Sequence, residues 1–369
     1  MIAAIDGFEW RDRPTGVGRF LQNVLAAMAP LAPRDRFVLF LPAPLAAPPA
    51  WPNVETIVAP CAGGFFRWQN QVLPGMVARR GCDRLWAPNN VPPLRPGVPT
   101  LVTVHDVSWR GVPADYSLKE RLSLDLRARW GLRRAAAVAA DSAFSAAEVE
   151  RWYGIHRGRV RVVHLGRQPG LRRAGAAEIA AFRGRYGLEG KTVIGFLGAL
   201  FGRRHVPETA AAVERLRRGR DAVLLLAGPD RLGAAARRRL DRDWIVRLPW
   251  LPEGEIAAFY SSLDLCCYLS EYEGFGLPPM EALQCGTVPL LLPGSSLGEL
   301  YDGCALFVDR PDPGRVAAAM ASFLDEPAAG AGMLRRWRER QELFSWARTA
   351  RAYLELLASL DGSGAARGS

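Results

Sequence analysis

Short runs of apolar residues alternate along this chain with longer stretches in which apolar residues recur every three or four positions. The short runs are typical of buried β-strands, and the longer stretches are typical of amphipathic helices. In the first half, strands are expected at residues 2–5, 37–41, 54–58, 84–87, 100–104, 136–140 and 160–164, and helices at 19–28, 68–80, 118–133 and 146–153. Such an alternation predicts a parallel sheet covered by helices on both faces.

The alternation restarts after a weakly patterned region from about residue 166 to residue 190. Strands are then expected at 193–197, 223–227, 244–248, 265–269, 288–292 and 305–308, and helices near 207–217, 234–240, 254–260 and 279–284. Two or three further helices are expected between 314 and 360. A chain of 369 residues exceeds the usual size of one domain, in agreement with this division.

The pattern therefore predicts an α/β protein of two Rossmann-like, doubly wound domains that face each other across a cleft. We place the first domain at residues 1–168 and the second at 169–345. A helix at about 346–360 is expected to pack back onto the first domain, and the small, polar tail at 362–369 is expected to be disordered. Ligands of such sheets bind at the carboxyl ends of the strands.

One segment at a predicted strand end, residues 273–281, combines glycines, prolines and two acids. Pro278 and Pro279 suit the first turn of a helix, and Gly274 and Gly276 allow a ligand to approach the backbone just before it. A helix N-terminus favours anions, and the carboxylates of Glu273 and Glu281 can accept hydrogen bonds from sugar hydroxyls. The alternative is that Glu281 only complements the helix dipole and that Glu273 is an exposed loop acid.

The wider segment EGFGLPPMEAL, residues 273–283, is followed by Gly286 and an apolar strand. It resembles the signature of the family 4 retaining glycosyltransferases of the GT-B fold. Further agreement with this family is found at residues 15–19, 104–106, 140–142, 257–262, 297–300 and 305–309. The resemblance implies that Glu273 contacts the donor sugar and Glu281 the ribose, with Gly274, Phe275, Gly276 and Leu277 lining the donor site.

Two adjacent arginines, Arg203 and Arg204, follow the first strand of the second domain. Arginines in a strand-to-helix loop can bind a diphosphate and stabilise the charge that develops when a sugar leaves. Family members commonly carry an arginine directly after the glycine of this loop and a lysine a few residues later. Here Ala199 stands at the first position, so we favour Arg204 as the substitute for the lysine, supported by Arg203. The alternative for either arginine is a solvated surface charge.

In the first domain, Gly16 and Gly18 follow the first strand and open a helix. The third glycine of a dinucleotide-binding fingerprint is absent, so the resemblance offers the better interpretation, a loop whose amides approach a donor phosphate; an ordinary tight turn is the alternative. His105 and Asp106 end another strand, without the G-x-S-x-G elbow of a serine hydrolase. By resemblance His105 lies near the reacting centre, and we take His105, Asp106 and Glu273 as candidate catalytic residues.

The formal net charge is +11 and comes almost entirely from arginine. It favours phosphate-bearing small molecules or an anionic lipid surface, because no nucleic-acid-binding motif accompanies it. Residues 241–243 match the D-x-D pattern of metal-dependent transferases, yet they follow an arginine-rich helix rather than a strand, so neither a metal nor a cofactor is expected.

The N-terminus has no basic region followed by a long apolar one, and no apolar run approaches the length of a membrane span, which predicts a cytoplasmic protein. Aromatic residues and a cation at residues 65–71 could touch a lipid-linked acceptor or the inner face of the membrane. The charges of the helix at 118–133 lie all round its axis, which argues against a membrane face there. Core aromatics with solvated arginines are the alternative.

The resemblance thus implies a metal-independent, retaining transfer, and we expect a hexose, with mannose favoured, from a GDP- or UDP-linked donor. The acceptor would be a glycan or a lipid-linked sugar used for cell-surface polysaccharide or glycolipid. A sugar-nucleotide epimerase or hydrolase of the same fold is one alternative. A non-catalytic subunit that binds nucleotide sugars is another, suggested by Ala199.

Overall fold

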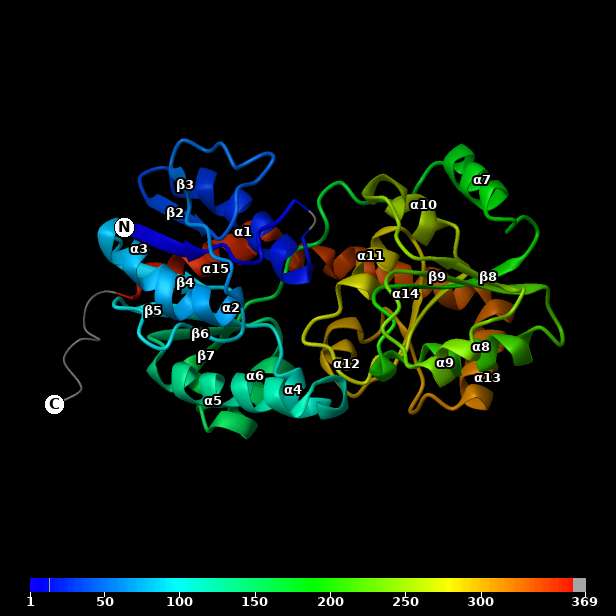
Figure 1. Ribbon diagram of the computed structural model, residues 1–369. Helices are drawn as coiled ribbons and strands as arrows, with labels where there is room; N and C mark the ends of the chain where they lie inside the picture. Colours follow the sequence, from blue (N-terminus) through cyan, green and yellow to red (C-terminus); the bar gives the residue numbers. More distant parts are fainter. Residues whose placement is uncertain (13, 361–369) are drawn as a thin grey trace. The chain divides into compact units, whose positions relative to one another are not determined.

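A computed structural model describes residues 1–12 and 14–360, and the tail at 362–369 lies outside them. The chain forms two compact units (Figure 1). Unit 1 contains Met1–Gly166 and the chain from Leu343 onward, whereas unit 2 contains Arg167–Glu342. The last helix therefore belongs to the same unit as the first strand.

Unit 1 is built on a parallel sheet with the strand order β3-β2-β1-β4-β5-β6-β7. Its strands are β1 (Ile2–Asp6), β2 (Arg36–Leu41), β3 (Val54–Val58), β4 (Arg84–Ala87), β5 (Thr100–Val104), β6 (Ala137–Ala140) and β7 (Val160–Val162). The inner strands are buried on both faces, which explains why they are nearly continuous apolar runs rather than alternating ones. Their register places Ala4 opposite Val38 and Leu101 opposite Ala137.

The helices of unit 1 are α1 (Gly16–Leu31), α2 (Gly64–Arg67), α3 (Leu73–Arg79), α4 (Ser108–Gly111), α5 (Leu118–Arg134), α6 (Ala143–Tyr153) and α15 (Trp346–Ala358). Instead of the one helix expected at 68–80, the structure has α2, a π-helical segment at Trp68–Val72 and then α3. Pro74 has no N–H to donate to the carbonyl four residues earlier, which interrupts the α-helical pattern. The short helix α4 was not expected.

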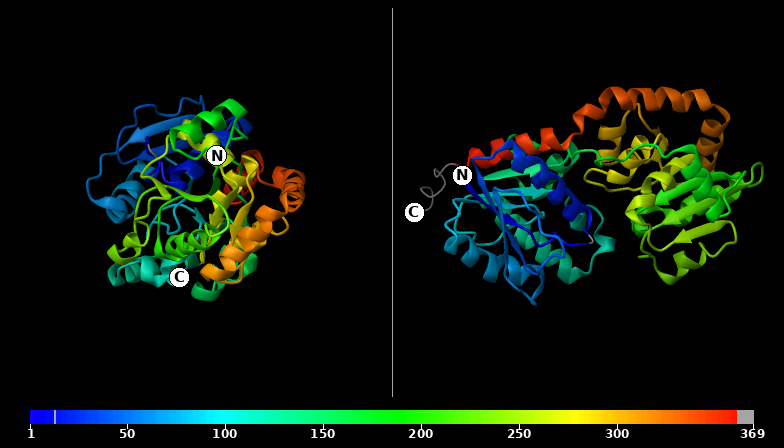
Figure 2. Two further views of the ribbon diagram at one scale, coloured as in Figure 1. Left: turned by 90° about the vertical axis from the view of Figure 1, so that its right-hand side faces the viewer. Right: turned by 90° about the horizontal axis from the view of Figure 1, so that it is seen from above.

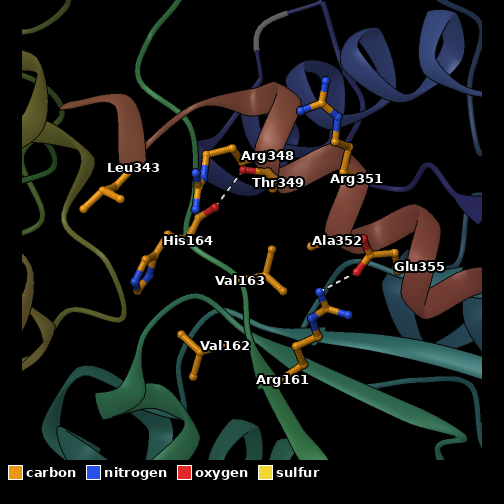
Figure 3. Close-up of a pocket in the computed structure, with 10 residues that line it drawn as sticks. All are labelled: Arg161, Val162, Val163, His164, Leu343, Arg348, Thr349, Arg351, Ala352 and Glu355. Carbon is orange, nitrogen blue, oxygen red and sulfur yellow. Dashed lines mark hydrogen bonds and ion pairs between the residues drawn. The ribbon is translucent and has the colours of Figure 1, made fainter. Parts of the chain in front are cut away.

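Helix α15 lies beside α1 on one face of the unit 1 sheet (Figure 2). The Tyr353 hydroxyl is 2.9 Å from Oγ1 of Thr103 on β5, and Arg84 on β4 donates to the Leu357 carbonyl. At the edge strand β7, α15 borders an open pocket of about 380 Å³ in which Arg161 and Glu355 form an ion pair of 2.6 Å (Figure 3). These contacts attach the end of the chain to the sheet that begins it.

Unit 2 repeats the architecture with the strand order β10-β9-β8-β11-β12-β13, all parallel. Its strands are β8 (Thr192–Leu197), β9 (Ala222–Ala227), β10 (Ile245–Leu248), β11 (Leu265–Tyr268), β12 (Pro289–Leu291) and β13 (Leu306–Phe307). Its helices are α7 (Ala176–Arg185), α8 (Val206–Leu216), α9 (Ala234–Arg238), α10 (Ile256–Ser261), α11 (Leu277–Gln284), α12 (Ser296–Tyr301), α13 (Pro313–Asp325) and α14 (Pro327–Arg340).

Two helices of unit 2 were missed by the sequence pattern. In α7 the one residue buried is Phe182, so no apolar stripe marks the helix. Helix α12 is six residues long and is opened by Ser295, whose hydroxyl accepts a hydrogen bond from the Leu297 amide. In both sheets the order runs outward in each direction from a central pair, β1 and β4 in unit 1 and β8 and β11 in unit 2. The predicted α/β class with two doubly wound, Rossmann-like domains is confirmed.

Candidate functional site

The candidate residues of unit 2 gather where its strand order reverses. Arg203 and Arg204 follow β8, Glu273 follows β11, and these two strands are hydrogen-bonded neighbours. The order of the remaining strands proceeds in opposite directions from this pair. In a doubly wound sheet the connections diverge at this point, and the loops beyond the carboxyl ends of the two strands leave room for a ligand.

The Glu273 carboxylate is the centre of this group. Its Oε1 atom lies 2.9 Å from Nη2 of Arg204 and accepts hydrogen bonds from Nε of Arg204 at 3.0 Å, the Tyr268 hydroxyl at 2.9 Å and the Ser270 hydroxyl at 2.8 Å. Its backbone carbonyl accepts a hydrogen bond from the Ser296 hydroxyl at 2.8 Å. The side chains of Arg204 and Glu273 are 12% and 13% exposed. Glu273 is therefore not an exposed loop acid but a fixed, mostly buried anion.

The charge of Glu273 is maintained by its neighbours. Burial alone would raise the pKa of this carboxyl, but the charges of Arg204 and Arg203 and the hydrogen bonds from Ser270 and Tyr268 outweigh burial and lower it. Burial and the adjacent carboxylate also raise the pKa of Tyr268 well above its ordinary value. At neutral pH the site thus holds an ionised acid, two cations and a neutral phenol that donates a hydrogen bond.

The two arginines differ in how they are held. Arg204 donates from Nη1 to the Ala199 carbonyl at 2.9 Å, and its guanidinium lies 5.2 Å from the centre of the Tyr268 ring. The Arg203 guanidinium lies 4.7 Å from the centre of the Phe201 ring. The backbone of Ala199, where the family commonly has an arginine, thus helps to orient Arg204. The structure places both cations beside Glu273, and which of them contacts which phosphate stays a prediction.

The turn before α11 depends on Gly276. Its φ angle of +87° lies in the left-handed region, and a Cβ atom there would meet Cδ2 of Leu297 at 2.4 Å. Its carbonyl accepts a hydrogen bond from the Tyr301 hydroxyl at 2.6 Å. Gly274 and Phe275 are buried, and Leu277 begins the helix. Only glycine combines this backbone conformation with this packing.

Glu281 lies deeper than the sequence suggested. It is 6% exposed and accepts a hydrogen bond at 2.9 Å from the hydroxyl of Tyr260, a residue of α10. Burial and the negative charge of Glu281 raise the pKa of Tyr260 well above its ordinary value, so the phenol stays a donor. Sequence reasoning did not find Tyr260 as a partner, because α10 and α11 come together only in the tertiary structure.

In unit 1, His105 is held at both ring nitrogens. Nδ1 is 2.7 Å from Oδ2 of Asp141, and Nε2 is 2.8 Å from the Pro88 carbonyl oxygen. Burial lowers the pKa of this histidine, but the charge and hydrogen bond of Asp141 and the Pro88 carbonyl raise it above its ordinary value. A carbonyl oxygen only accepts, so Nε2 donates to Pro88; an ionised Asp141 accepts from Nδ1 as well, which makes the ring an imidazolium. Burial raises the pKa of Asp141 itself above its ordinary value.

These contacts fix the orientation of His105, and its expected place beside a ligand stays a prediction. Both ring nitrogens are hydrogen-bonded within unit 1, and the backbone is also fixed: the His105 amide donates to Asn90 at 2.7 Å, and its carbonyl accepts from Ser145 at 2.8 Å. The sequence pattern contained Asp141 as part of a motif but gave it no role, since the loops after β5 and β6 meet only in the folded sheet.

The other candidates of unit 1 lie at helix starts. Oδ1 of Asp106 accepts hydrogen bonds from the Ser108 amide at 2.9 Å and the Ser108 hydroxyl at 2.7 Å, at the beginning of α4. Gly16 and Gly18 lie in the first turn of α1, which begins three residues earlier than expected because Thr15 caps it. A Cβ atom on Gly18 would meet the Glu9 carbonyl oxygen at 2.4 Å, whereas one on Gly16 would meet nothing within 4 Å.

The D-x-D residues Asp241 and Asp243 are exposed and lie between α9 and β10, away from the strand ends that hold Glu273. Within residues 1–12 and 14–360, three or more His, Cys, Asp or Glu side chains nowhere cluster in a way that could hold a metal ion. In the same residues, none of the helices combines the length and apolar character needed to cross a bilayer.

Comparison with known families identifies both halves of the chain. Residues 16–169 match the model described as Glycosyltransferase Family 4, and residues 179–343 match the model described as Glycosyl transferases group 1. The chain belongs to the family 4 glycosyltransferases. The second match includes both β8 and β11, so the Glu273 site lies within the region that this glycosyltransferase family shares.

Among characterised relatives, 2-deoxystreptamine glucosyltransferase of Streptomyces kanamyceticus is 32% identical over 260 residues, which cover 66% of each chain. O-antigen chain mannosyltransferase B of Escherichia coli is 24% identical over 254 residues, 67% of this chain and 66% of the relative. The match thus spans just under two thirds of the length of these relatives.

Among solved structures, the Anabaena protein HepE in complex with UDP-glucose has a TM-score of 0.75 at 16% identity, over 97% of this chain and 100% of HepE. This likeness shows that the chain has the GT-B fold, and it shows nothing beyond the fold.

Proposed function

We propose that this family 4 glycosyltransferase moves a hexose from a nucleotide diphosphate sugar to an acceptor hydroxyl with retention of the anomeric configuration. The observation that carries the proposal is the Glu273 carboxylate, ionised and nearly buried beside Arg203 and Arg204 at the switch point of unit 2. Such a site offers an acceptor for sugar hydroxyls and cations for a leaving diphosphate within a few ångströms of each other.

In the proposed reaction, the bond between the anomeric carbon and the diphosphate oxygen breaks and leaves an oxocarbenium-like sugar. Arg203 and Arg204 offset the charge that develops on the diphosphate, a task that many other transferases give to a metal ion. The acceptor oxygen then bonds to the anomeric carbon on the same face, and its proton passes to the departing phosphate. Glu273 binds hydroxyls of the transferred sugar and favours the positive charge beside it.

Glu281 and the backbone of the α11 turn complete the proposed donor site. Glu281 would hold the ribose, with one carboxylate oxygen already positioned by Tyr260. The amides of the turn from Gly274 to Leu277 would face the donor. In this proposal unit 1 provides the acceptor side, and Gly16 and Gly18 contribute backbone amides. Because both ring nitrogens of His105 are used within unit 1, we assign it a positioning role in which it fixes the loops after β4, β5 and β6.

We infer that the donor is a GDP- or UDP-linked hexose, with mannose favoured. Relatives named as a glucosyltransferase and a mannosyltransferase support a hexose, and HepE was solved with UDP-glucose. We propose a glycan or lipid-linked acceptor for cell-surface polysaccharide or glycolipid synthesis, reached from the cytoplasmic side of the membrane. The name of the mannosyltransferase relative, which acts on an O-antigen chain, supports this acceptor class.

A donor-turnover assay with and without acceptor extracts tests the proposal. A transferase releases nucleotide diphosphate only when an acceptor is present. An epimerase or hydrolase consumes the donor without an acceptor, whereas a non-catalytic subunit binds the donor without turnover. Arg204→Ala and Glu281→Ala should weaken donor binding in a thermal-shift titration, whereas the exposed Glu339→Gln should not. If both site variants bind and transfer like the unaltered protein, the site is wrong; an inverted product would refute retention alone.

A further inference from the structure

Helix α5 of unit 1 presents a row of exposed leucines. Leu118, Leu122 and Leu126 are 68%, 54% and 64% exposed. A spacing of four residues places all three on one side of a helix. The buried residues of α5, which include Ala128 and Leu132, lie on the other side. Leucines cost free energy in water, so a row of them on an outer face indicates a surface that is covered in use.

Cations accompany these leucines. Lys119, Arg129 and Arg133 are exposed on the same side of α5, and within the described chain no carboxylate pairs with Lys119 or Arg129. The two acids of the helix are used elsewhere. Glu120 turns back to accept hydrogen bonds from Ser117 at the helix start, and Asp125, with a side chain 13% exposed, is ion-paired with Arg110. The outer face of α5 is therefore apolar and positive.

A second segment contacts α5 through Arg127, which is buried and lies outside the leucine row. Phe66 of α2 is 49% exposed, and the guanidinium of Arg127 on α5 lies 5.3 Å from the centre of its ring. Arg127 itself is buried, donates to Gln69 at 2.6 Å and joins a network in which Gln69 and Trp68 both donate to Asp6. The aromatic segment at 65–71 thus divides into a buried anchor, Trp68 and Gln69, and an outward ring, Phe66.

The burial pattern revises the interpretation made from the sequence. Charges lie all round α5, which argued against a membrane face, but the fold removes Arg127 from the surface and pairs Asp125 with Arg110. What remains on the outer face of α5 is leucine and positive charge. Long basic side chains can extend their charges to a lipid headgroup while apolar neighbours enter the layer beneath it.

We infer that the outer face of α5, called here the α5 face, docks onto the surface of a bilayer that contains anionic lipid. It is defined by Leu118, Lys119, Leu122, Leu126, Arg129 and Arg133. Charge complementarity selects this occupant, because anionic headgroups attract the cations while the leucines gain free energy on leaving water. The inference does not depend on the identity of the donor or on transfer, and it would bring the enzyme to lipid-linked acceptors.

Vesicle co-sedimentation of the full chain tests this proposal, with vesicles of phosphatidylcholine alone and of phosphatidylcholine with about a third phosphatidylglycerol. The unaltered protein should bind the anionic vesicles, and binding should fall as salt is raised. Leu122→Ser/Leu126→Ser should weaken binding about tenfold or more, and Lys119→Gln/Arg129→Gln about fivefold for each cation. The matched control, Trp250→Ser, removes a side chain of unit 2 that is 66% exposed and should change nothing.

Two outcomes would overturn the proposal. One is an unaltered protein that stays in solution with anionic vesicles. The other is a leucine double variant that binds them as well as the unaltered protein does. Sedimentation velocity distinguishes a further case: a dimer that the double variant converts to a monomer, without vesicle binding, would make the α5 face an interface between copies. Thermal shift with UDP and GDP on each variant reports donor binding independently, so failure here leaves the proposed function intact.

Discussion

Glu273 in unit 2 and His105 in unit 1 can be compared, since each is a mostly buried titratable side chain in the loop after an inner strand of a parallel sheet. The Glu273 carboxylate has two arginines beside it, Arg203 and Arg204, which form part of the same strand-end loops. Both ring nitrogens of His105 are hydrogen-bonded, one to Asp141 and the other to the Pro88 carbonyl. A titratable residue at a strand end can therefore form part of a charged ligand site or hold neighbouring loops in place. Its hydrogen-bond partners indicate which of these two roles it has.

The largest effect is expected on the rate of transfer, when the charge of Glu273 is removed. Glu273→Gln keeps the size of the side chain but removes its charge, and we expect transfer to fall by about 10²- to 10³-fold in kcat, as for other residues that stabilise a transition state electrostatically. Single-turnover kinetics with saturating donor would measure it, with Glu339→Gln as the control. Activity within threefold of the unaltered enzyme would remove Glu273 from the proposed mechanism.

The next prediction concerns folding stability. Arg204→Met leaves the Glu273 carboxylate mostly buried without its closest cation, and we expect a loss of about 3 kcal/mol in the free energy of unfolding. Urea denaturation measures the loss. The double variant Arg204→Met/Glu273→Gln should recover much of it, because no uncompensated charge remains. Equal destabilisation of the single and double variants would show that the two side chains are not energetically coupled.

Replacing His105 should lower the free energy of unfolding by an amount that depends on pH. His105→Gln should lose about 1.5–3 kcal/mol through its charged hydrogen bonds. Because the pKa of His105 is raised in the fold, its stabilisation is complete below its unfolded pKa of about 6.5 and is lost as pH rises through the folded pKa. The difference in unfolding free energy between the unaltered protein and His105→Gln should thus be larger at pH 6 than at pH 9. A difference independent of pH would contradict the imidazolium.

The smallest effects come from the two glycines of α1. Gly18→Ala places a methyl group 2.4 Å from the Glu9 carbonyl oxygen and should cost about 1–3 kcal/mol, whereas Gly16→Ala adds one in open space and should stabilise α1 by about 0.5–1 kcal/mol. Thermal unfolding of the pair shows the contrast. Gly16→Ala also sharpens the role of unit 1: a loss of donor affinity without a loss of stability would support contact between this turn and the donor.

Much of the fold could be read from the sequence because strands buried on both faces are continuous apolar runs; β3, β4 and β5 begin and end at the residues expected. Elements with weak patterns were less accessible. Helix α7 buries little, α12 is six residues long and is opened by Ser295, and Pro74 interrupts the helix expected at 68–80. In each case a local feature, a cap or a missing N–H, decided the element rather than the apolar period.

For this family 4 glycosyltransferase, the sequence alone determined the class of fold, the family and the short list of candidate residues, since these depend on periodicity and on motifs local in the chain. The tertiary structure decided what those residues do to one another. It brought together Arg204 with Glu273, Tyr260 with Glu281 and Asp141 with His105, each pair joined by a hydrogen bond or an ion pair. It also sorted the charges of α5 into buried, paired and exposed. Hydrogen bonds and burial join residues far apart in sequence, and no local pattern records which strand ends will meet.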